Sequence, residues 1–140
     1  MKKILIPVDT LELSEKMMEM ARDLAEKFGS EIIILHVQPV LSDSFPPHLS
    51  LGLDYNGFHE ISQQIVNNAR SKFDGANIDS IRTHISEGNP ASVIVDFAEH
   101  QQCDLILLST HSLGSVRRFL LGSVTNKVVH HAKVPVLIVR

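Results

Sequence analysis

Two short stretches of this sequence contain residue types that could hold a charged ligand. Asp9 follows directly after an apolar run at residues 4–8, where its carboxylate can accept hydrogen bonds from sugar hydroxyls or the edge of a base. Gly122 and Ser123 precede a helical pattern, and the free N–H groups of a helix N-terminus attract phosphate. The hydroxyls of Ser123 and Thr125 can donate to phosphate oxygens. Either stretch could instead be a plain cap, so they form a site only if the fold joins them.

Five short apolar segments predict the strands that must position these residues. They lie at residues 4–8, 32–37, 81–85, 105–108 and 134–139, and the third is a weaker, alternating pattern. Continuous runs of Ile, Leu and Val are typical of strands covered on both faces, as in parallel sheets.

Amphipathic stretches between these segments predict four helices. The first has a Ser14 N-cap and a Gly29 stop signal. The second spans about residues 58–73, with apolar side chains at four-residue spacing from Ile61 onward. The third begins at the Asn-Pro dipeptide 89–90, and the last begins near residue 123.

The alternation of strands and helices predicts an α/β fold. Right-handed crossovers make it a single-domain doubly wound parallel five-stranded sheet with helices on both faces. Ligands of such sheets bind outside the carboxyl ends of the strands, where the winding direction reverses. Four places qualify, at residues 7–10, 37–38, 87–89 and 109–123. Asp9 and Gly122 are therefore expected to meet at one rim, and we favour a ligand contact for Asp9 over a capping role.

The last predicted strand, from Val134 to Val139, contains Pro135. Proline cannot donate to a central ladder, so this strand is expected at an edge of the sheet. An apolar edge invites aggregation unless something covers it. A second copy of the chain is the economical cover, which predicts a homodimer through this strand.

Three stretches resemble the hallmarks of the universal stress protein family. They are LLGSV at 120–124 with PVLIV at 135–139, ILIPVD at 4–9, and EGNPA at 87–91. The similarity spans essentially the whole chain. It implies the sheet order 3-2-1-4-5, one universal-stress-protein-like domain over residues 1–140, and a homodimer joined through the fifth strands.

The resemblance also implies an adenine nucleotide site. One branch of the family binds ATP through G-x2-G-x9-G-(S/T), and another branch lacks this motif and does not bind ATP. The final pair falls on Gly122 and Ser123, whereas the first two glycine positions hold Ser109 and Ser112, with Gly114 two residues beyond. The implied cofactor is ATP, with or without magnesium, and Val37 falls where the family holds the adenine. The full set of implied binding residues is Pro7, Val8, Asp9, Val37, Ser109, Ser112, Gly114, Gly122, Ser123, Val124 and Thr125.

Two functions therefore stay open at this point. The first is a stress-response regulatory protein that binds ATP as a homodimer, favoured by Asp9 and Gly122-Ser123. The second is a dimeric stress or adaptor protein that binds no nucleotide and keeps a relict pocket, favoured by Ser109 and Ser112. No P-loop, G-x-S-x-G elbow or nucleophile–base pair is present, so at most weak ATP hydrolysis is expected, with no catalytic residue assigned.

The bulk properties exclude several classes of partner. A net charge of −3 leaves no basic surplus for nucleic acid, and no apolar stretch approaches the roughly 20 residues that span a bilayer. The single cysteine, Cys103, points to a structural thiol and a cytoplasmic protein. The eight histidines are scattered and are expected at the surface or at helix ends, not as metal ligands.

One long connection, residues 38–57, joins the second strand to the second helix. It contains prolines and glycines together with several apolar side chains. Connections of this length are usually functional, so a lid or a protein-partner contact and a locally packed surface loop are both open.

Overall fold

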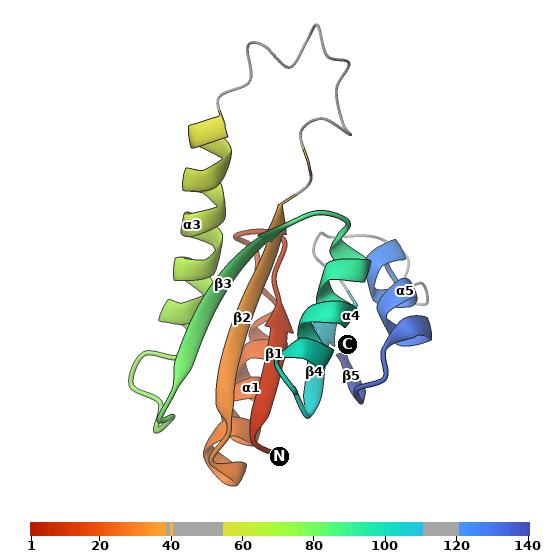
Figure 1. Ribbon diagram of the computed structural model, residues 1–140. Helices are drawn as coiled ribbons and strands as arrows, with labels where there is room; N and C mark the ends of the chain where they lie inside the picture. The colour runs from red at the N-terminus through yellow and green to blue at the C-terminus, as the bar shows by residue number, and fades with distance from the viewer. Residues whose placement is uncertain (39, 41–54, 111–120) are drawn as a thin grey trace, which may run out of the picture.

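The computed structural model describes residues 1–38, 40, 55–110 and 121–140 of the chain. Five parallel strands form one sheet in the order β3-β2-β1-β4-β5 (Figure 1), which confirms the predicted topology. The strands are β1 (Lys3–Pro7), β2 (Glu31–Gln38), β3 (Ile81–Glu87), β4 (Leu105–Ser109) and β5 (Val136–Val139). The helices in the described ranges are α1 (Glu15–Phe28), α3 (Tyr55–Ser71), α4 (Pro90–His100) and α5 (Ser123–His131).

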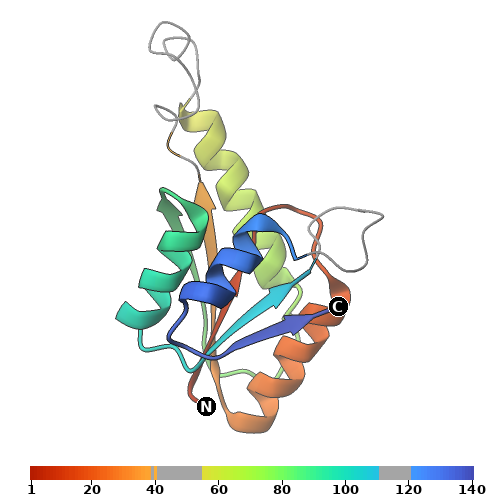
Figure 2. The ribbon, with the colours of Figure 1, turned by 90° about the vertical axis from the view of Figure 1, so that its right-hand side faces the viewer.

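Helices cover both faces of the sheet, with α1 and α3 on one face and α4 and α5 on the other (Figure 2). The central strands alternate between two apolar layers: Ile4 and Ile6 pack with the α1 and α3 side chains, and Leu5 packs with those of α4 and α5. All three are fully buried. Because both faces of these strands are buried, their sequences are continuous apolar runs.

Side chains cap the helices where the sequence predicts it. The Ser14 hydroxyl accepts a hydrogen bond from the Met17 N–H at 3.3 Å, and Gly29 ends α1 in the left-handed conformation with φ 62°. The Asn89 side chain accepts from the Ser92 N–H at 3.2 Å. Both caps satisfy backbone donors that a helix cannot satisfy internally.

Gly88 fixes the turn that leads from β3 into α4. Its φ of 140° is a conformation that residues with a side chain rarely adopt, and a Cβ there would lie 3.0 Å from the Val93 Cγ2 atom. Its N–H donates to the Gln38 carbonyl at 3.0 Å. The turn thus places the start of α4 against the carboxyl end of β2.

Several element bounds differ from the sequence prediction, and three of them concern the edge strand and the long loop. β5 begins at Val136 and not at Val134, because Pro135 has no N–H; its carbonyl instead accepts from the Ile106 N–H at 2.9 Å. The strand does lie at an edge, as predicted. Gln38 belongs to β2 and α3 begins at Tyr55, so both ends of the predicted loop 38–57 are regular structure. Residues 39 and 41–54 of that loop lie outside the described part of the chain.

One predicted core position on α3 is exposed, since the Ile61 side chain is 52% accessible. Steps of four residues overshoot one turn of 3.6 residues, so a row at this spacing drifts around the helix. Ile65 and Ala69 remain on the buried face, and Ile61 has rotated out of it. Cys103 is buried, as expected for a structural thiol, and burial raises its pKa. In the described ranges, no helix combines the length and the apolar character needed to cross a membrane.

Candidate functional site

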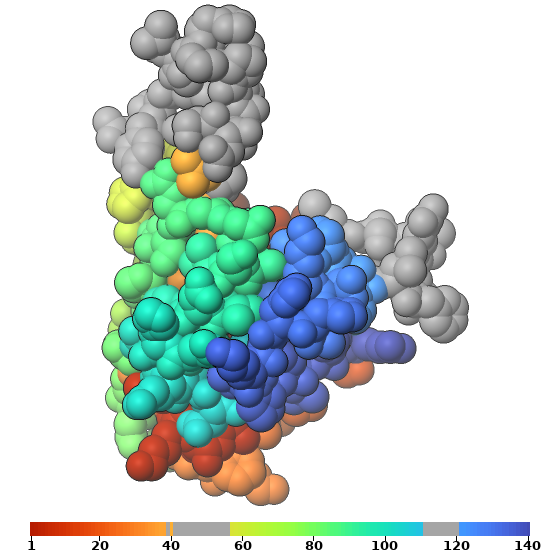
Figure 3. Space-filling model, turned by 45° about the vertical axis from the view of Figure 1, so that its right-hand side comes forward, coloured from red at the N-terminus to blue at the C-terminus, as the bar shows by residue number. Residues whose placement is uncertain are grey.

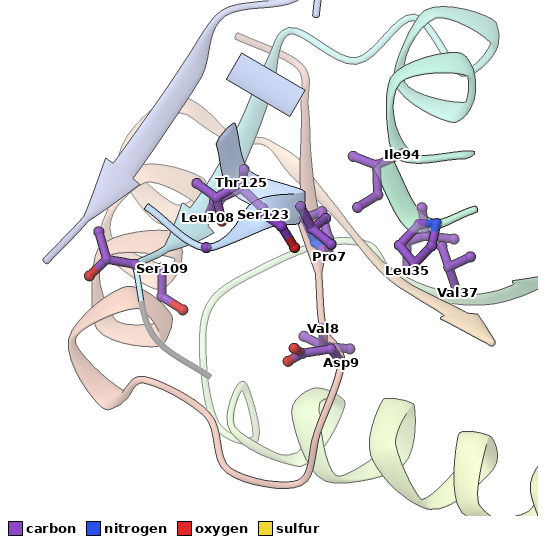
Figure 4. A pocket seen from close by; sticks show the side chains of 14 residues that line it. Pro7, Val8, Asp9, Leu35, Val37, Ile94, Leu108, Ser109, Ser123 and Thr125 are labelled. Atoms are coloured by element: carbon purple, nitrogen blue, oxygen red, sulfur yellow. The ribbon is translucent and has the colours of Figure 1, made fainter. Parts of the chain in front are cut away.

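A cavity of about 340 Å³ lies at the carboxyl ends of the central strands (Figure 4). The chain leaves β1 toward β2 on one side and reaches β4 on the other, so this is where the winding direction reverses. The residues that line it are Pro7, Val8, Asp9, Leu35, Val37, Pro90, Ile94, Leu108, Ser109, Thr110, Gly122, Ser123, Val124 and Thr125.

The fold brings most of the predicted binding residues together in this one cavity. The set comprises Pro7, Val8, Asp9, Val37, Ser109, Gly122, Ser123, Val124 and Thr125. Ser112 and Gly114 lie outside the described residues. The end of β1 and the turn before α5 are more than a hundred residues apart in sequence, and they meet at the rim as the topology predicts. That these residues bind a ligand stays a prediction.

Sequence reasoning missed one wall of the cavity, formed by Leu35, Pro90, Ile94 and Leu108. Thr110, within the stretch 109–123 that the sequence pointed to, also lines the cavity. The side chains of Leu35, Ile94 and Leu108 are almost completely buried. Pro90 and Ile94 lie one turn apart at the start of α4, which is a signal the sequence carried. This wall is apolar and well packed, so it offers a preformed surface to a flat apolar group.

The opposite side of the cavity is polar. Asp9 is exposed, and within the described part of the chain its carboxylate has no hydrogen bond or ion pair. Its oxygens turn toward the side where Ser109 and Ser123 lie (Figure 4). Among the described lining residues, Asp9 is the only charged side chain. The Asp9 carboxylate can therefore accept hydrogen bonds from the hydroxyl or amino groups of a ligand.

The N-terminus of α5 opens onto the same cavity. Gly122 is its N-cap residue, and no side chain of the described residues caps the helix, in contrast to the N-termini of α1 and α4. A Cβ added to Gly122 would meet no atom of the described residues within 4 Å. The first N–H groups of α5 therefore lie beside the cavity without a side-chain acceptor among the described residues, and the positive end of the helix dipole lies there as well.

One histidine departs from the expected surface or helix-end position. His36 lies within β2 and is only 7% exposed. Its Nδ1 atom is 2.8 Å from the carbonyl oxygen of Val8, which lines the cavity. The run IIILHV at 32–37 carried the signal, because a residue inside a strand that is covered on both faces must be buried.

A second hollow, of about 430 Å³, lies between α4 and α5, which form one continuous surface (Figure 3). It is lined by Asn89, Ala91, Ser92, Val95, Asp96, Lys127 and His131 and contains none of the predicted binding residues. Within the described residues, no group of three or more His, Cys, Asp or Glu side chains is gathered as a metal site requires.

The fold and the cavity define a doubly wound α/β protein with a preformed site at the switch point of its sheet. The family model of the Universal stress protein family matches residues 1–140, and the chain belongs to this family. The universal stress protein MJ0531 of Methanocaldococcus jannaschii is 32% identical over 99% of this chain and 82% of its own length. The universal stress protein YxiE of Bacillus subtilis is 28% identical over 99% of this chain and 98% of its own length.

Solved structures share the fold. The hypothetical protein MJ0577 superimposes with a TM-score of 0.79 at 27% identity, covering 99% of this chain and 94% of that one. A universal stress protein in complex with cAMP gives a TM-score of 0.74 at 21% identity, over 99% and 97% of the two chains. One from Archaeoglobus fulgidus in complex with dAMP gives 0.67 at 22% identity, over 100% and 98%.

Proposed function

We propose that this protein is a stress-response regulator that binds an adenine nucleotide, ATP in the first instance, in the cavity at the carboxyl ends of the sheet. The observation that carries the proposal is the uncapped N-terminus of α5, which opens on the same cavity as the Asp9 carboxylate. As part of the same proposal the protein works in the cytoplasm, where a lone buried thiol such as Cys103 stays reduced.

The apolar wall suits the base of a nucleotide. Leu35, Ile94 and Leu108 come from a strand, a helix and a second strand, and each is held by the surrounding core. Close-packed side chains on rigid elements present a fixed surface, so little conformational entropy is lost when a flat ring covers them. Val37, half-buried at the end of β2, extends this wall to the mouth of the cavity.

The polar side suits the sugar and the phosphates. A carboxylate such as that of Asp9 accepts the hydrogen bonds that ribose hydroxyls donate. Phosphate oxygens accept from the N–H groups at the start of α5, and the hydroxyls of Ser123 and Thr125 can add further donors. The open space beside Gly122 lets a phosphate approach the backbone.

The structural relatives supply a precedent for this fold with such a ligand. The two universal stress proteins bound to cAMP and to dAMP each carry an adenine nucleotide with one phosphate. ATP carries more charge, and the described lining offers no cationic side chain. The sequence between Ser109 and Gly122 adds Arg117 and Arg118, so a comparison of ATP with AMP measures what the additional phosphates contribute.

The test is isothermal titration of the purified protein with ATP and with AMP, with and without magnesium, after a check for co-purified nucleotide. Binding of either in the micromolar range supports the proposal, and Asp9→Ala is expected to weaken it about tenfold through the loss of charged hydrogen bonds. No heat at millimolar nucleotide, with no nucleotide carried over from purification, would reject it. The alternative of a dimeric adaptor protein with a relict pocket would then stand.

We further propose that the protein is a homodimer through β5. The strand pairs with β4 on one side only, and Leu137 is 36% exposed on the sheet face that α1 covers. The Lys16 ammonium donates to the Arg140 carbonyl at 2.9 Å and holds α1 beside the end of β5. Met20, one turn after Lys16, is 38% exposed on the same side. The open ladder and these apolar side chains favour pairing with a second copy.

Light scattering coupled to gel filtration tests this dimer. Wild type is expected to elute as a dimer, and Leu137→Lys as a monomer, because a lysine on an edge strand opposes pairing. Ile61→Lys is the matched control, since Ile61 is an exposed apolar side chain on α3, away from β5. A monomeric wild type would overturn the proposal. Whether the connection at residues 38–57 is a lid or protein-partner contact or a locally packed surface loop stays a prediction, because residues 39 and 41–54 lie outside the described part of the chain.

A further inference from the structure

The buried His36 is connected to the candidate site through the backbone of β1. It shares the sheet face of Ile34, which packs with α1 and α3, whereas the next residue, Val37, lies at the cavity. His36 therefore lies on the far side of the sheet from the cavity wall that Leu35 and Val37 form. No part of the proposed nucleotide contact uses it.

The bond that His36 makes is located where the strand pairing stops. The register of β1 against β2 ends at Pro7 and Leu35, and the Val8 N–H donates to the Leu35 carbonyl at 2.8 Å. The Val8 carbonyl is then bound by a side chain, the His36 Nδ1 atom at 2.8 Å. A carbonyl oxygen can only accept, so Nδ1 carries the hydrogen and the imidazole donates.

This bond holds the peptide unit from which Asp9 projects. The Val8 carbonyl and the Asp9 nitrogen belong to one planar group, so fixing the carbonyl direction fixes the direction in which the chain leaves the sheet. Val8 and Asp9 both line the cavity. We propose that His36 is a positioning residue, which orients the Asp9 carboxylate toward the ligand by anchoring the Val8 carbonyl. The ligand part of this inference rests on the proposed nucleotide binding.

A pair of substitutions separates the donor from the bulk of the ring. In His36→Asn the amide nitrogen occupies nearly the place of Nδ1 and keeps the donor, whereas His36→Leu keeps an apolar volume and removes it. We expect His36→Leu to weaken nucleotide binding about tenfold and His36→Asn to restore most of that affinity, because one hydrogen bond is at stake. Equal losses in both variants would overturn the role of the donor.

A double-mutant cycle with Asp9 tests the route by which His36 acts. If His36 acts through Asp9, then His36→Leu adds no further loss of affinity in the Asp9→Ala background. A loss that is fully additive would overturn the inference, since His36 would then affect the ligand by another path. If His36→Leu fails to fold, then His36→Met replaces it, because the flexible thioether fills irregular spaces without donating an N–H bond.

Hydrogen exchange of the free protein tests the positioning role without any ligand. Loss of the His36 bond is expected to speed exchange of the Val8 N–H, which donates to the Leu35 carbonyl, with exchange in α4 unchanged and His36→Asn close to wild type. Unchanged exchange of the Val8 N–H in His36→Leu would overturn the positioning role. A wild type that binds no nucleotide would reject the proposed function, and the exchange measurement would still decide the role of His36.

Discussion

The two ends of the parallel sheet treat their polar groups in opposite ways. At the amino end, the chain satisfies its own polar atoms: the Asp104 carboxylate accepts from the backbone N–H groups of Lys2 and Lys3 at 2.6 and 2.9 Å. At the same end the Lys3 ammonium donates to the Gln101 carbonyl at 2.8 Å, and Glu31 is paired with Arg82. The Arg82 hydrogen bond holds the pKa of the Glu31 carboxyl below its usual range.

At the carboxyl end, two kinds of group beside the cavity lack such partners. The N–H groups that begin α5 have no side-chain cap, and the Asp9 carboxylate has no partner among the described residues. The difference teaches how to separate stability from binding in this fold. Groups that the chain satisfies internally contribute to the free energy of unfolding, and groups that it leaves open are available to a ligand.

The largest change in nucleotide affinity is expected from a substitution that caps the N-terminus of α5. Gly122→Asp places a capping carboxylate before α5, so stability is expected to rise by a few tenths of a kcal/mol while nucleotide affinity falls about 100-fold or more. The fall follows from repulsion between the new carboxylate and phosphate. Thermal unfolding and titration calorimetry on the same samples measure the two changes.

Gly122→Asn is the matched control for charge, because asparagine caps as well as aspartate and is neutral. It is expected to weaken binding less than Gly122→Asp does. If both affinity and stability fell together in Gly122→Asp, then the N-terminus of α5 would have a structural role and the proposed division between the two ends would fail.

Gly88, like Asn89 and the Val8 carbonyl, lies at the carboxyl end and is satisfied internally, so it tests the comparison from the other side. Its N–H is bound to the Gln38 carbonyl, its φ of 140° is strained for any residue with a side chain, and a Cβ would lie only 3.0 Å from the Val93 Cγ2 atom. Gly88→Ala is expected to lower the free energy of unfolding by about 2 kcal/mol. Urea unfolding measures this loss, and Gly75→Ala, at a φ of 78° where a Cβ meets no described atom within 4 Å, gives the cost of a positive φ without a close contact. Losses of equal size would contradict a role for the Val93 contact.

The N-terminus of α1, which has a side-chain cap, provides a comparison with the uncapped N-terminus of α5. Ser14→Ala removes the side-chain acceptor for the Met17 N–H and is expected to lower stability by about 1 kcal/mol, with nucleotide affinity unchanged. Ser14→Asp keeps an acceptor and is the control that should retain wild-type stability. A fall in affinity for Ser14→Ala would mean that α1 also communicates with the site.

Much of this fold could be predicted from particular residues. Pro135 placed the last strand at an edge, and Asn89 with Pro90 marked the start of α4, because both depend on the backbone chemistry of a single residue. The meeting of Asp9 with Gly122 followed from strand order alone, since the carboxyl ends of parallel strands share one rim.

The apolar wall of the cavity and the place of His36 were harder to predict. Leu35 and Leu108 stand in continuous apolar runs, where neighbours of the same type give no alternation to tell one sheet face from the other. Leu107 packs under α1 and α3, and Leu108 lines the cavity, although the two are identical in type. The position of His36 was predicted from the average behaviour of histidines, and the strand around it overrode that average.

The smallest expected effect is a pH-dependent change in stability from a substitution at the amino end of the sheet. The hydrogen bonds from the Lys2 and Lys3 N–H groups hold the pKa of the Asp104 carboxyl below its usual range. Folding therefore favours the ionised form, so its contribution is fully present above the unfolded pKa, near 4, and is lost as the pH falls through the lower, folded value.

Asp104→Asn is expected to lower Tm at pH 7 by about 2–4 °C, a difference that shrinks toward pH 3, with nucleotide affinity unchanged. Glu12→Gln, at an exposed carboxylate, controls for the loss of one negative charge. A Tm difference that stayed constant from pH 7 to acid would mean that the Asp104 charge does not stabilise the amino end. The amino end would then resemble the carboxyl end in leaving its carboxylate without an energetic role in the fold.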